Sequence, residues 1–154
     1  MSIFSDINDQ WIAADNAFSA VESRAFASDD DVLFDKASEM RKRNDQAYFL
    51  YLFTRFEAAV NDAVMVVRDN RILPTIAWSE RRMWETLNRR EIKDVAFLTR
   101  VEILIDKSRS EYATVKAYYE GRNKVAHGGI WEEQFVIPAI ATTMELLVQT
   151  FPTS

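Results

Sequence analysis

The fold is decided by residues 49–67, which read FLYLFTRFEAAVNDAVMVV. The apolar side chains of this segment recur every three or four residues, at Phe49, Leu52, Phe53, Phe56, Val60, Ala63, Val64 and Val67. This spacing follows the turn of an α-helix and gives one wide apolar stripe. Such a stripe is typical of a helix at the centre of a protein core. The pattern predicts a helix from about Phe34 to Arg68.

The chain before this segment also has a helical period. Residues 3–26 predict a first helix, because Ile7, Trp11, Ala14, Phe18 and Val21 return every three or four positions. The run Ser28-Asp29-Asp30-Asp31 ends that helix and can cap the next one, since short polar side chains accept hydrogen bonds from free backbone N–H groups.

After the long helix, residues 70–77 predict a connection that contains Pro74. Ser79 is the expected N-cap of a short helix over Arg81 to Leu87, with Glu80 in its first turn. The stretch Asn88-Arg89-Arg90-Glu91 resembles a capping box and predicts another helix through Ile105.

Two helices are expected at the carboxyl end of the chain. Ser110 and Glu111 begin the first of them, and His127-Gly128-Gly129 ends it, because glycine readily takes the left-handed conformation that closes a helix. Pro138 suits the first turn of the last helix. The inward-facing side chains of that helix are expected to be Ile140, Met144, Leu147 and Phe151.

The composition favours the same architecture. Only three glycines and three prolines occur in 154 residues, whereas folds rich in strands need both residue types in their many turns. Apolar residues make up 48% of the chain, enough for a sizeable core. We therefore predict an all-α protein, an up-and-down bundle of five or six helices, with residues 1–154 as a single domain.

Several classes of site and location are excluded or disfavoured by residue types. The chain has no cysteine, which excludes disulfides, thiolate metal sites and cysteine nucleophiles. With a single histidine as well, no metal and no other cofactor is expected. Neither a signal peptide nor a membrane-spanning apolar run is visible, so a soluble, cytoplasmic protein that does not contact a membrane is expected.

Charge is distributed unevenly along the chain. Residues 1–39 carry nine acids and two bases, whereas residues 40–154 carry seventeen bases and fifteen acids. The formal net charge of −5 therefore comes from an acidic N-terminal segment, and the rest of the chain is mildly basic. Anionic ligands are permitted by this distribution but are not required by it.

The residues with the clearest chemical content form the string Arg122-Asn123-Lys124-Val125-Ala126-His127. His127 is the only residue of the type that ordinarily exchanges a proton near neutral pH. Asn123 and His127 are one helical turn apart and share a face, and Arg122 lies about 100° around the helix from Asn123. A guanidinium, an amide and an imidazole near a helix end suit a phosphodiester, because arginine can hold the phosphate and histidine can move a proton.

The same spacing also fits a structural role. A histidine at the end of a helix is stabilised by the negative end of the helix dipole, with Arg122 and Asn123 on a solvated face. Spacing alone leaves these two interpretations open.

Two stretches of the chain resemble the HEPN superfamily. The first is the string Arg122-Asn123-Lys124-Val125-Ala126-His127, late in a small helical domain, ending in glycine and followed by a final helix. The second is residues 51–62, which are similar to the first long core helix of bacterial HEPN proteins.

The resemblance implies a metal-independent endoribonuclease of the toxin–antitoxin or phage-defence kind. It implies a homodimer in which two strings face each other across one cleft, with Arg122 and His127 as catalytic residues and Asn123 orienting the histidine or binding phosphate. Cleavage would proceed by attack of the ribose 2′-hydroxyl. The expected partners are RNA and a nucleotidyltransferase-like antitoxin. The alternative is a non-catalytic helical dimer that binds RNA or a partner protein, and a third interpretation is an interaction module with no role in nucleic acid binding.

Other polar residues are weaker candidates. Glu57 and Asn61 are one turn apart and could line the cleft, although the boundary of a solvated helix face explains them equally well. Lys124 is a second candidate for substrate binding. Arg55 is more simply an ion-pair partner of Glu57. The basic clusters could follow an RNA backbone, but solvated faces with acidic neighbours are the simpler explanation; these clusters are Arg41-Lys42-Arg43, Arg81-Arg82 and Arg89-Arg90.

Overall fold

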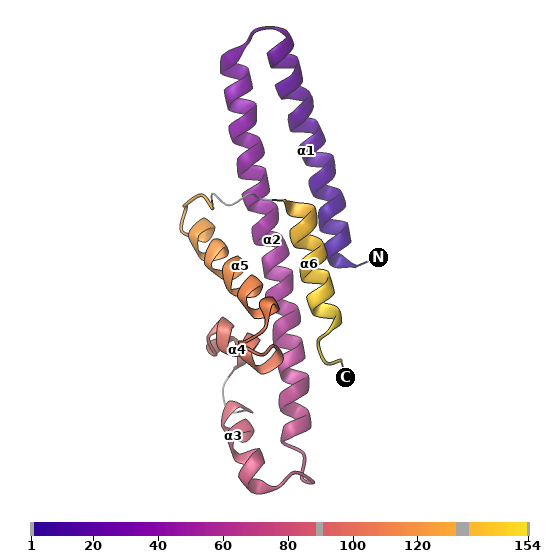
Figure 1. The fold of residues 1–154 in the computed structure, drawn as a ribbon, viewed down its shortest axis with the longest axis vertical. Coiled ribbons are helices and arrows are strands. Elements are labelled where there is room, and N and C mark those ends of the chain that lie inside the picture. Colours follow the sequence, from indigo (N-terminus) through magenta and orange to yellow (C-terminus); the bar gives the residue numbers. More distant parts are fainter. Residues whose placement is uncertain (1, 89–90, 132–135, 154) are drawn as a thin grey trace. The chain divides into compact units, whose positions relative to one another are not determined.

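The computed structural model describes residues 2–88, 91–131 and 136–153, and every regular element among them is helical (Figure 1). The elements are α1 (Ile3–Ala27), α2 (Asp31–Arg71), α3 (Trp78–Asn88), a 3₁₀ turn η1 (Ile92–Asp94), α4 (Phe97–Leu104), α5 (Ser110–Ala126) and α6 (Ile137–Gln149). The predicted all-α fold of five or six helices is confirmed for the described part of the chain, which has six α-helices. None of these helices is long and apolar enough to cross a membrane.

The described residues form two compact units. Unit 1 comprises Met1–Arg55 and Glu120–Glu145, and unit 2 comprises Phe56–Tyr119 and Leu146–Ser154. Helices α2, α5 and α6 contribute residues to both units. The expectation of a single domain stays a prediction.

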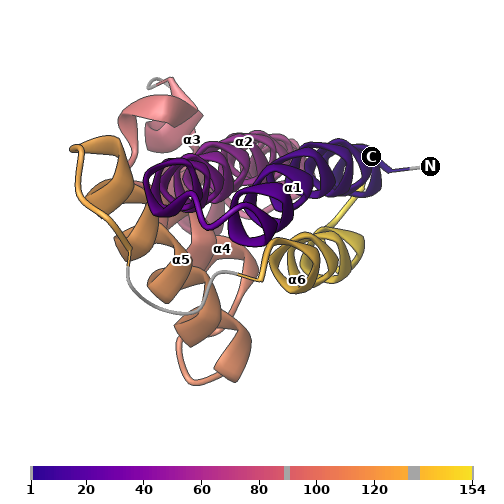
Figure 2. The same ribbon diagram turned by 90° about the horizontal axis from the view of Figure 1, so that it is seen from above.

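Unit 1 is built on an antiparallel hairpin of α1 and the first part of α2, which lie side by side in both ribbon views (Figures 1 and 2). As the acidic run predicts, the turn between the helices closes with a cap, because the Asp30 carboxylate accepts a 3.0 Å hydrogen bond from the Leu33 N–H. Asp29 takes a positive φ of 53°, a conformation that aspartate tolerates better than most residues. The helix begins at Asp31, three residues before the predicted start.

The apolar stripe of α2 is buried from Phe49 to Val64, as predicted, whereas Val67 at its end is only half-buried. In unit 1 its buried residues are Phe49, Leu52 and Phe53, and α1 and α6 add Ile7, Ile137 and Met144. In unit 2 the stripe continues with Phe56, Val60 and Val64, and other elements add Val101, Val115 and Phe151. The rings of Phe56 and Phe151 lie 6.1 Å apart. All four inward-facing residues predicted for the last helix are buried.

Two predicted helix starts are wrong. Helix α3 begins at Trp78, and the Ala77 carbonyl accepts its first hydrogen bonds from Glu80 and Arg81, so Ser79 lies inside the helix and cannot be its N-cap. The helix expected from Asn88 to Ile105 is divided. Asn88 ends α3, and α4 starts only at Phe97.

The division has a backbone cause. Asn88 ends α3 and Glu91 has an extended backbone, so the helix predicted to begin at this capping box does not start here. After η1, Val95 and Ala96 both take extended ψ values, of 133° and 138°, which interrupt the helical hydrogen-bond ladder. Arg89 and Arg90 lie outside the described residues.

Candidate functional site

The string lies at the carboxyl end of α5, in unit 1. This end is closed by a pair of backbone hydrogen bonds, from the Gly129 N–H to the Lys124 carbonyl and from the Gly128 N–H to the Val125 carbonyl, each 2.9 Å long. Gly128 has a φ of +81°, so the pair forms a Schellman motif with glycine in the left-handed position. The predicted termination of the helix by glycine is confirmed, and His127 is its last half-helical residue.

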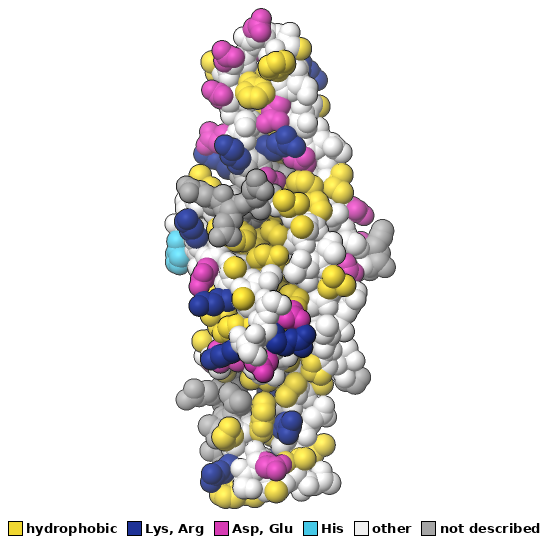
Figure 3. Space-filling model, in the orientation of Figure 1, with side chains coloured by type: hydrophobic (Ala, Val, Ile, Leu, Met, Phe, Trp, Pro, Cys, Tyr) yellow, Lys and Arg dark blue, Asp and Glu magenta, His cyan; other side chains and the backbone are white. Residues whose placement is uncertain are grey.

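The string places its polar groups at different depths. Arg122 and Asn123 are half-buried, and the Arg122 Nη1 donates a 3.0 Å hydrogen bond to the Asn123 side-chain oxygen. His127 is exposed (Figure 3, cyan), and its backbone N–H donates to the Asn123 carbonyl at 3.1 Å. Lys124 is also exposed. The structure thus brings the guanidinium and the amide together one turn before the imidazole, at a helix end open to solvent.

The segment after the string is fixed by Trp131. Its ring lies 4.9 Å from the ring of the buried Phe49 on α2, measured between centroids. On α5, a Cβ atom at Gly121 would come within 2.5 Å of the Trp131 ring. Only glycine therefore leaves room for the indole, which joins the residues after α5 to α2. This contact was not predicted from the sequence, although an isolated glycine inside a helical pattern can indicate close packing.

A groove of about 450 Å³ lies in unit 1 beside the string. The end of α5 and the residues after it supply one wall, with Val125, Gly128, Gly129 and Ile130. Helix α2 supplies the other wall, from Glu39 to Leu50. The lining has an aliphatic part, from Ala47, Leu50, Val125 and Ile130, and a polar part, from Glu39, Lys42, Arg43 and Gln46. This groove could not be predicted from the sequence, because its two walls come from residues about eighty positions apart.

Glu57 belongs to unit 2 and has a partner that the sequence analysis missed. Its carboxylate accepts a 2.8 Å hydrogen bond from Arg100 on α4, and the same guanidinium donates to the side chain of Asn61. Arg100 is only 4% exposed. Glu57 and Asn61 lie one turn apart on α2, so both side chains can accept hydrogen bonds from this one buried guanidinium. The role of Glu57 toward a substrate stays a prediction. The expected ion pair with Arg55 is replaced by other contacts, since the Arg55 guanidinium lies 5.4 Å from the centre of the Tyr51 ring.

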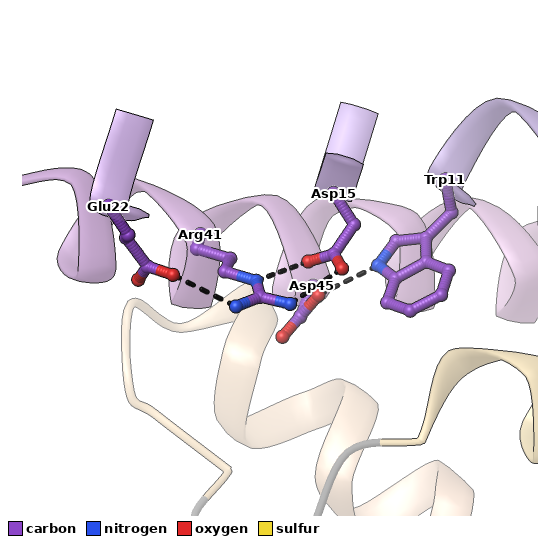
Figure 4. A network of polar contacts seen from close by, with 5 residues as sticks. All are labelled: Trp11, Asp15, Glu22, Arg41 and Asp45. Atoms are coloured by element: carbon purple, nitrogen blue, oxygen red, sulfur yellow. Dashed lines mark hydrogen bonds and ion pairs between the residues drawn. The ribbon is translucent and has the colours of Figure 1, made fainter. Parts of the chain in front are cut away.

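In the basic cluster at residues 41–43, Lys42 and Arg43 are exposed, as the simpler interpretation predicts, whereas Arg41 is half-buried. Arg41 lies between two carboxylates of α1 (Figure 4), with Nη2 donating to Asp15 at 2.7 Å and Nη1 donating to Glu22 at 2.9 Å. Hydrogen bonding to Asp15, above all, raises the pKa of Arg41. Arg43 pairs with Glu39. In the second cluster, Arg81 pairs with Glu85 at 2.9 Å, whereas Arg89 and Arg90 are not among the described residues.

Next to Arg41, Asp45 is a carboxylate in a partly buried setting. The Trp11 Nε1 donates a 2.7 Å hydrogen bond to it, from α1 to α2 (Figure 4). Burial raises the pKa of Asp45, and the hydrogen bond from Trp11 opposes this rise only in part. The network is better explained as a clamp between α1 and α2 than as a ligand-binding site. Its polar groups already bond one another across the two helices, since Arg41 pairs with Asp15 and Asp45 accepts from Trp11.

Among the described residues, no group of three or more histidine, cysteine, aspartate or glutamate side chains is placed to hold a metal ion. A scan against protein-family models gave no match, and searches of curated proteins and of solved structures gave none of significance. The likeness to the HEPN superfamily therefore rests on the two stretches of sequence quoted above, and it stays a prediction.

Proposed function

We propose that the protein is a metal-independent endoribonuclease of the HEPN type, with Arg122 and His127 as its catalytic pair. The observation that carries the proposal is the exposed end of α5, where an arginine–asparagine pair lies one turn before the only histidine. A left-handed glycine follows directly, and a Cβ atom at Gly128 would meet nothing within 4 Å, so a ligand can approach the backbone there.

The proposed chemistry needs a proton acceptor and a cation near one phosphodiester. His127 would take the proton from the ribose 2′-hydroxyl, whose oxygen then attacks the adjacent phosphorus. Arg122 would stabilise the negative charge that develops on the phosphate oxygens. The bond from phosphorus to the 5′-oxygen breaks, and that oxygen takes up a proton from the solvent, which leaves a 2′,3′-cyclic phosphate on one fragment and a 5′-hydroxyl on the other. Asn123 holds the guanidinium through its side-chain oxygen, so it serves as a positioning residue.

The proposal includes a homodimer with two strings in one cleft, and a nucleotidyltransferase-like antitoxin as a second partner. Both follow from the resemblance. The toxin–antitoxin or phage-defence role and a cytoplasmic location belong to the same proposal.

The second candidate is a non-catalytic helical dimer that binds RNA or a partner protein. The observation in its favour is that the Arg122 guanidinium is already engaged by its neighbour Asn123, as in a purely structural pair.

Cleavage of total RNA in EDTA by the wild type and by the His127→Ala and Arg122→Ala variants distinguishes the two candidates. We expect the wild type to cut and both variants to lose at least about a hundredfold in rate. Arg109→Ala is the matched control, because Arg109 is an exposed arginine that pairs with Glu111 in unit 2, and it should cut at the wild-type rate. Equal cleavage by the wild type and the His127→Ala variant would contradict the proposal, and RNA binding without cleavage would support the second candidate.

A further inference from the structure

One face of α2 runs along the hairpin of unit 1, from the turn to the groove. Val32, Glu39, Arg43, Gln46 and Leu50 are separated by three, four or seven residues, so they lie on the same side of the helix. Val32, Glu39 and Arg43 are exposed, and the last four of the five line the groove. Val32 and Leu50 are eighteen residues apart, which is five helical turns, or about 27 Å. Because α2 is continuous, both ends of this face point in the same direction.

The two ends of the face differ in shape and are both apolar. At the turn, Val32 is 81% exposed, and Phe26 at the end of α1 is 77% exposed. Figure 3 shows hydrophobic and acidic side chains at this end of the hairpin. At the other end lies the groove of about 450 Å³, with an aliphatic lining from Ala47, Leu50, Val125 and Ile130. Exposed apolar side chains that gather in this way mark an interaction surface, and a projecting end is complementary to a hollow one.

The charges between the two ends are complementary when a second copy of the face runs in the opposite direction. From the turn onward, the exposed acids Asp35 and Glu39 come first, and the exposed bases Lys42 and Arg43 follow. In an antiparallel pair centred on position 41, Glu39 of each copy lies opposite Arg43 of the other. Opposite charges facing each other in this way favour one register of pairing.

The same register matches the remaining positions of the face. Val32 lies opposite Leu50, so the apolar turn of one copy meets the groove of the other. Lys36 lies opposite the neutral Gln46. Within one copy, the ion pair of Arg43 with Glu39 has side chains that are 78% and 64% exposed, so it contributes little by itself. In the antiparallel pair, two such ion pairs join into one cluster of four alternating charges.

We propose that this face of α2 binds a second copy of the chain in an antiparallel, two-fold arrangement, in which the turn of each copy fills the groove of the other. A two-fold interface requires that each contact between two different residues is made twice, and a face that carries both the projecting and the hollow end meets this requirement. The inference rests on the homodimer of the proposed function, to which it adds the surface, and it does not depend on catalysis by the string.

Light scattering with charge-reversed variants tests the register. The wild type at micromolar concentration should have the mass of two chains rather than the 17.9 kDa of one. Glu39→Arg places bases opposite bases, and Arg43→Glu places acids opposite acids, so each variant alone should dissociate at least about tenfold more readily. An equimolar mixture of the two variants should form dimers again, because each then supplies the charge that the other needs. Arg109→Glu, at an exposed ion pair of unit 2, is the matched control and should remain dimeric.

The absence of cysteine from the chain allows a second test by cross-linking. A variant with both Val32→Cys and Leu50→Cys should form a disulfide-linked dimer on mild oxidation. The two positions are about 27 Å apart within one helix, so this disulfide cannot form inside one copy. Each single variant should stay without a cross-link, because identical positions of the two copies are also about 27 Å apart. Circular dichroism of every variant checks that the helices are retained.

The possible outcomes separate the inference from the proposed function. A dimer that persists in both charge-reversed variants would place the interface on another surface and overturn the inference, while the proposed function would be unaffected. A mixture of the two variants that stays monomeric would also overturn it. A monomeric wild type would assign the face to a different protein or to none, and would remove the homodimer from the proposed function as well. Cleavage of RNA in EDTA by the wild type tests the chemistry of the string separately in every case.

Discussion

The contact between Gly121 and Trp131 allows a prediction in which two opposing effects can be compared. Replacing Gly121 by alanine, inside α5, should by itself stabilise the helix by about 1 kcal/mol, because alanine is the better helix former. The new Cβ atom would however lie 2.5–2.8 Å from three atoms of the Trp131 ring. Ordinary carbon contacts are about 3.5 Å or longer, so the ring would have to move by about 1 Å.

Overpacking of this kind costs roughly 1–3 kcal/mol. The net effect of Gly121→Ala on the free energy of unfolding should therefore be a loss of about 1 kcal/mol. In a Trp131→Ala background the clash is gone and only helix propensity is left, so Gly121→Ala should stabilise that background by about 0.5–1 kcal/mol. The sign of the effect should thus reverse, which corresponds to a coupling energy of about 2 kcal/mol.

Urea unfolding of the four proteins, followed by far-ultraviolet circular dichroism, measures this coupling. Gly128→Ala is the control, because its strain comes from a positive φ and its Cβ would meet nothing within 4 Å. That substitution should cost about 1 kcal/mol with or without Trp131. If Gly121→Ala stabilised the wild type as much as the Trp131→Ala variant, the Trp131 indole would not pack on Gly121, and the segment after α5 would not be held in the way described.

Three further predictions concern polar groups in the two units. Arg41→Met should destabilise the protein by about 1–2 kcal/mol in urea unfolding, and by less at high salt. Arg43→Met should change the stability by about 0.5 kcal/mol or less, because the ion pair of Arg43 with Glu39 is exposed. Equal effects of the two substitutions would contradict the clamp between α1 and α2. Burial raises the folded-state pKa of Asp45, so its ionisation opposes folding above that pKa and the opposition disappears as the pH falls through it. Asp45→Asn should therefore be more stable than the wild type at pH 7, with a difference that shrinks as unfolding is measured at increasingly acidic pH; a difference that grows on acidification would refute this sign. Arg100→Met should cost about 3 kcal/mol, because it leaves the carboxylate of its partner partly buried without a cation, and thermal unfolding that is unchanged would show that the pair is dispensable.

The helices were predictable wherever a clear apolar period coincides with local end signals. The long α2, the capped turn at Asp30 and the glycine-terminated end of α5 all have both, and each is confirmed. The failures lie between residues 77 and 97, where capping residues are present but do not decide the backbone. Ser79 has the right side chain for an N-cap, yet the chain turns into the helix two residues earlier, at Ala77.

The candidate site was only partly predictable for a different reason. Residues that are close in sequence, such as Arg122, Asn123 and His127, can be placed on a helix from their spacing alone. Contacts between distant segments cannot, because they depend on how helices pack. The buried Arg100, which donates hydrogen bonds to Glu57 and Asn61, is thirty-nine or more positions from either residue. The groove is likewise lined by α2 on one side and by the end of α5 and the residues after it on the other. In both cases the spacing along one helix shows which residues share a face, but it does not show which distant residues contact that face.

In the proposed function, the string cuts RNA through the ribose 2′-hydroxyl. The most direct measurement compares a structured RNA with a fully 2′-deoxy oligonucleotide of the same sequence, each incubated with the wild type and with His127→Ala in EDTA, followed by identification of the fragment ends. We expect that only the RNA is cut, only by the wild type, and that the fragments end in 2′,3′-cyclic phosphate and 5′-hydroxyl groups. Cleavage of the deoxy oligonucleotide, fragments with 5′-phosphate ends, or cleavage that survives the loss of His127 would contradict the proposed function.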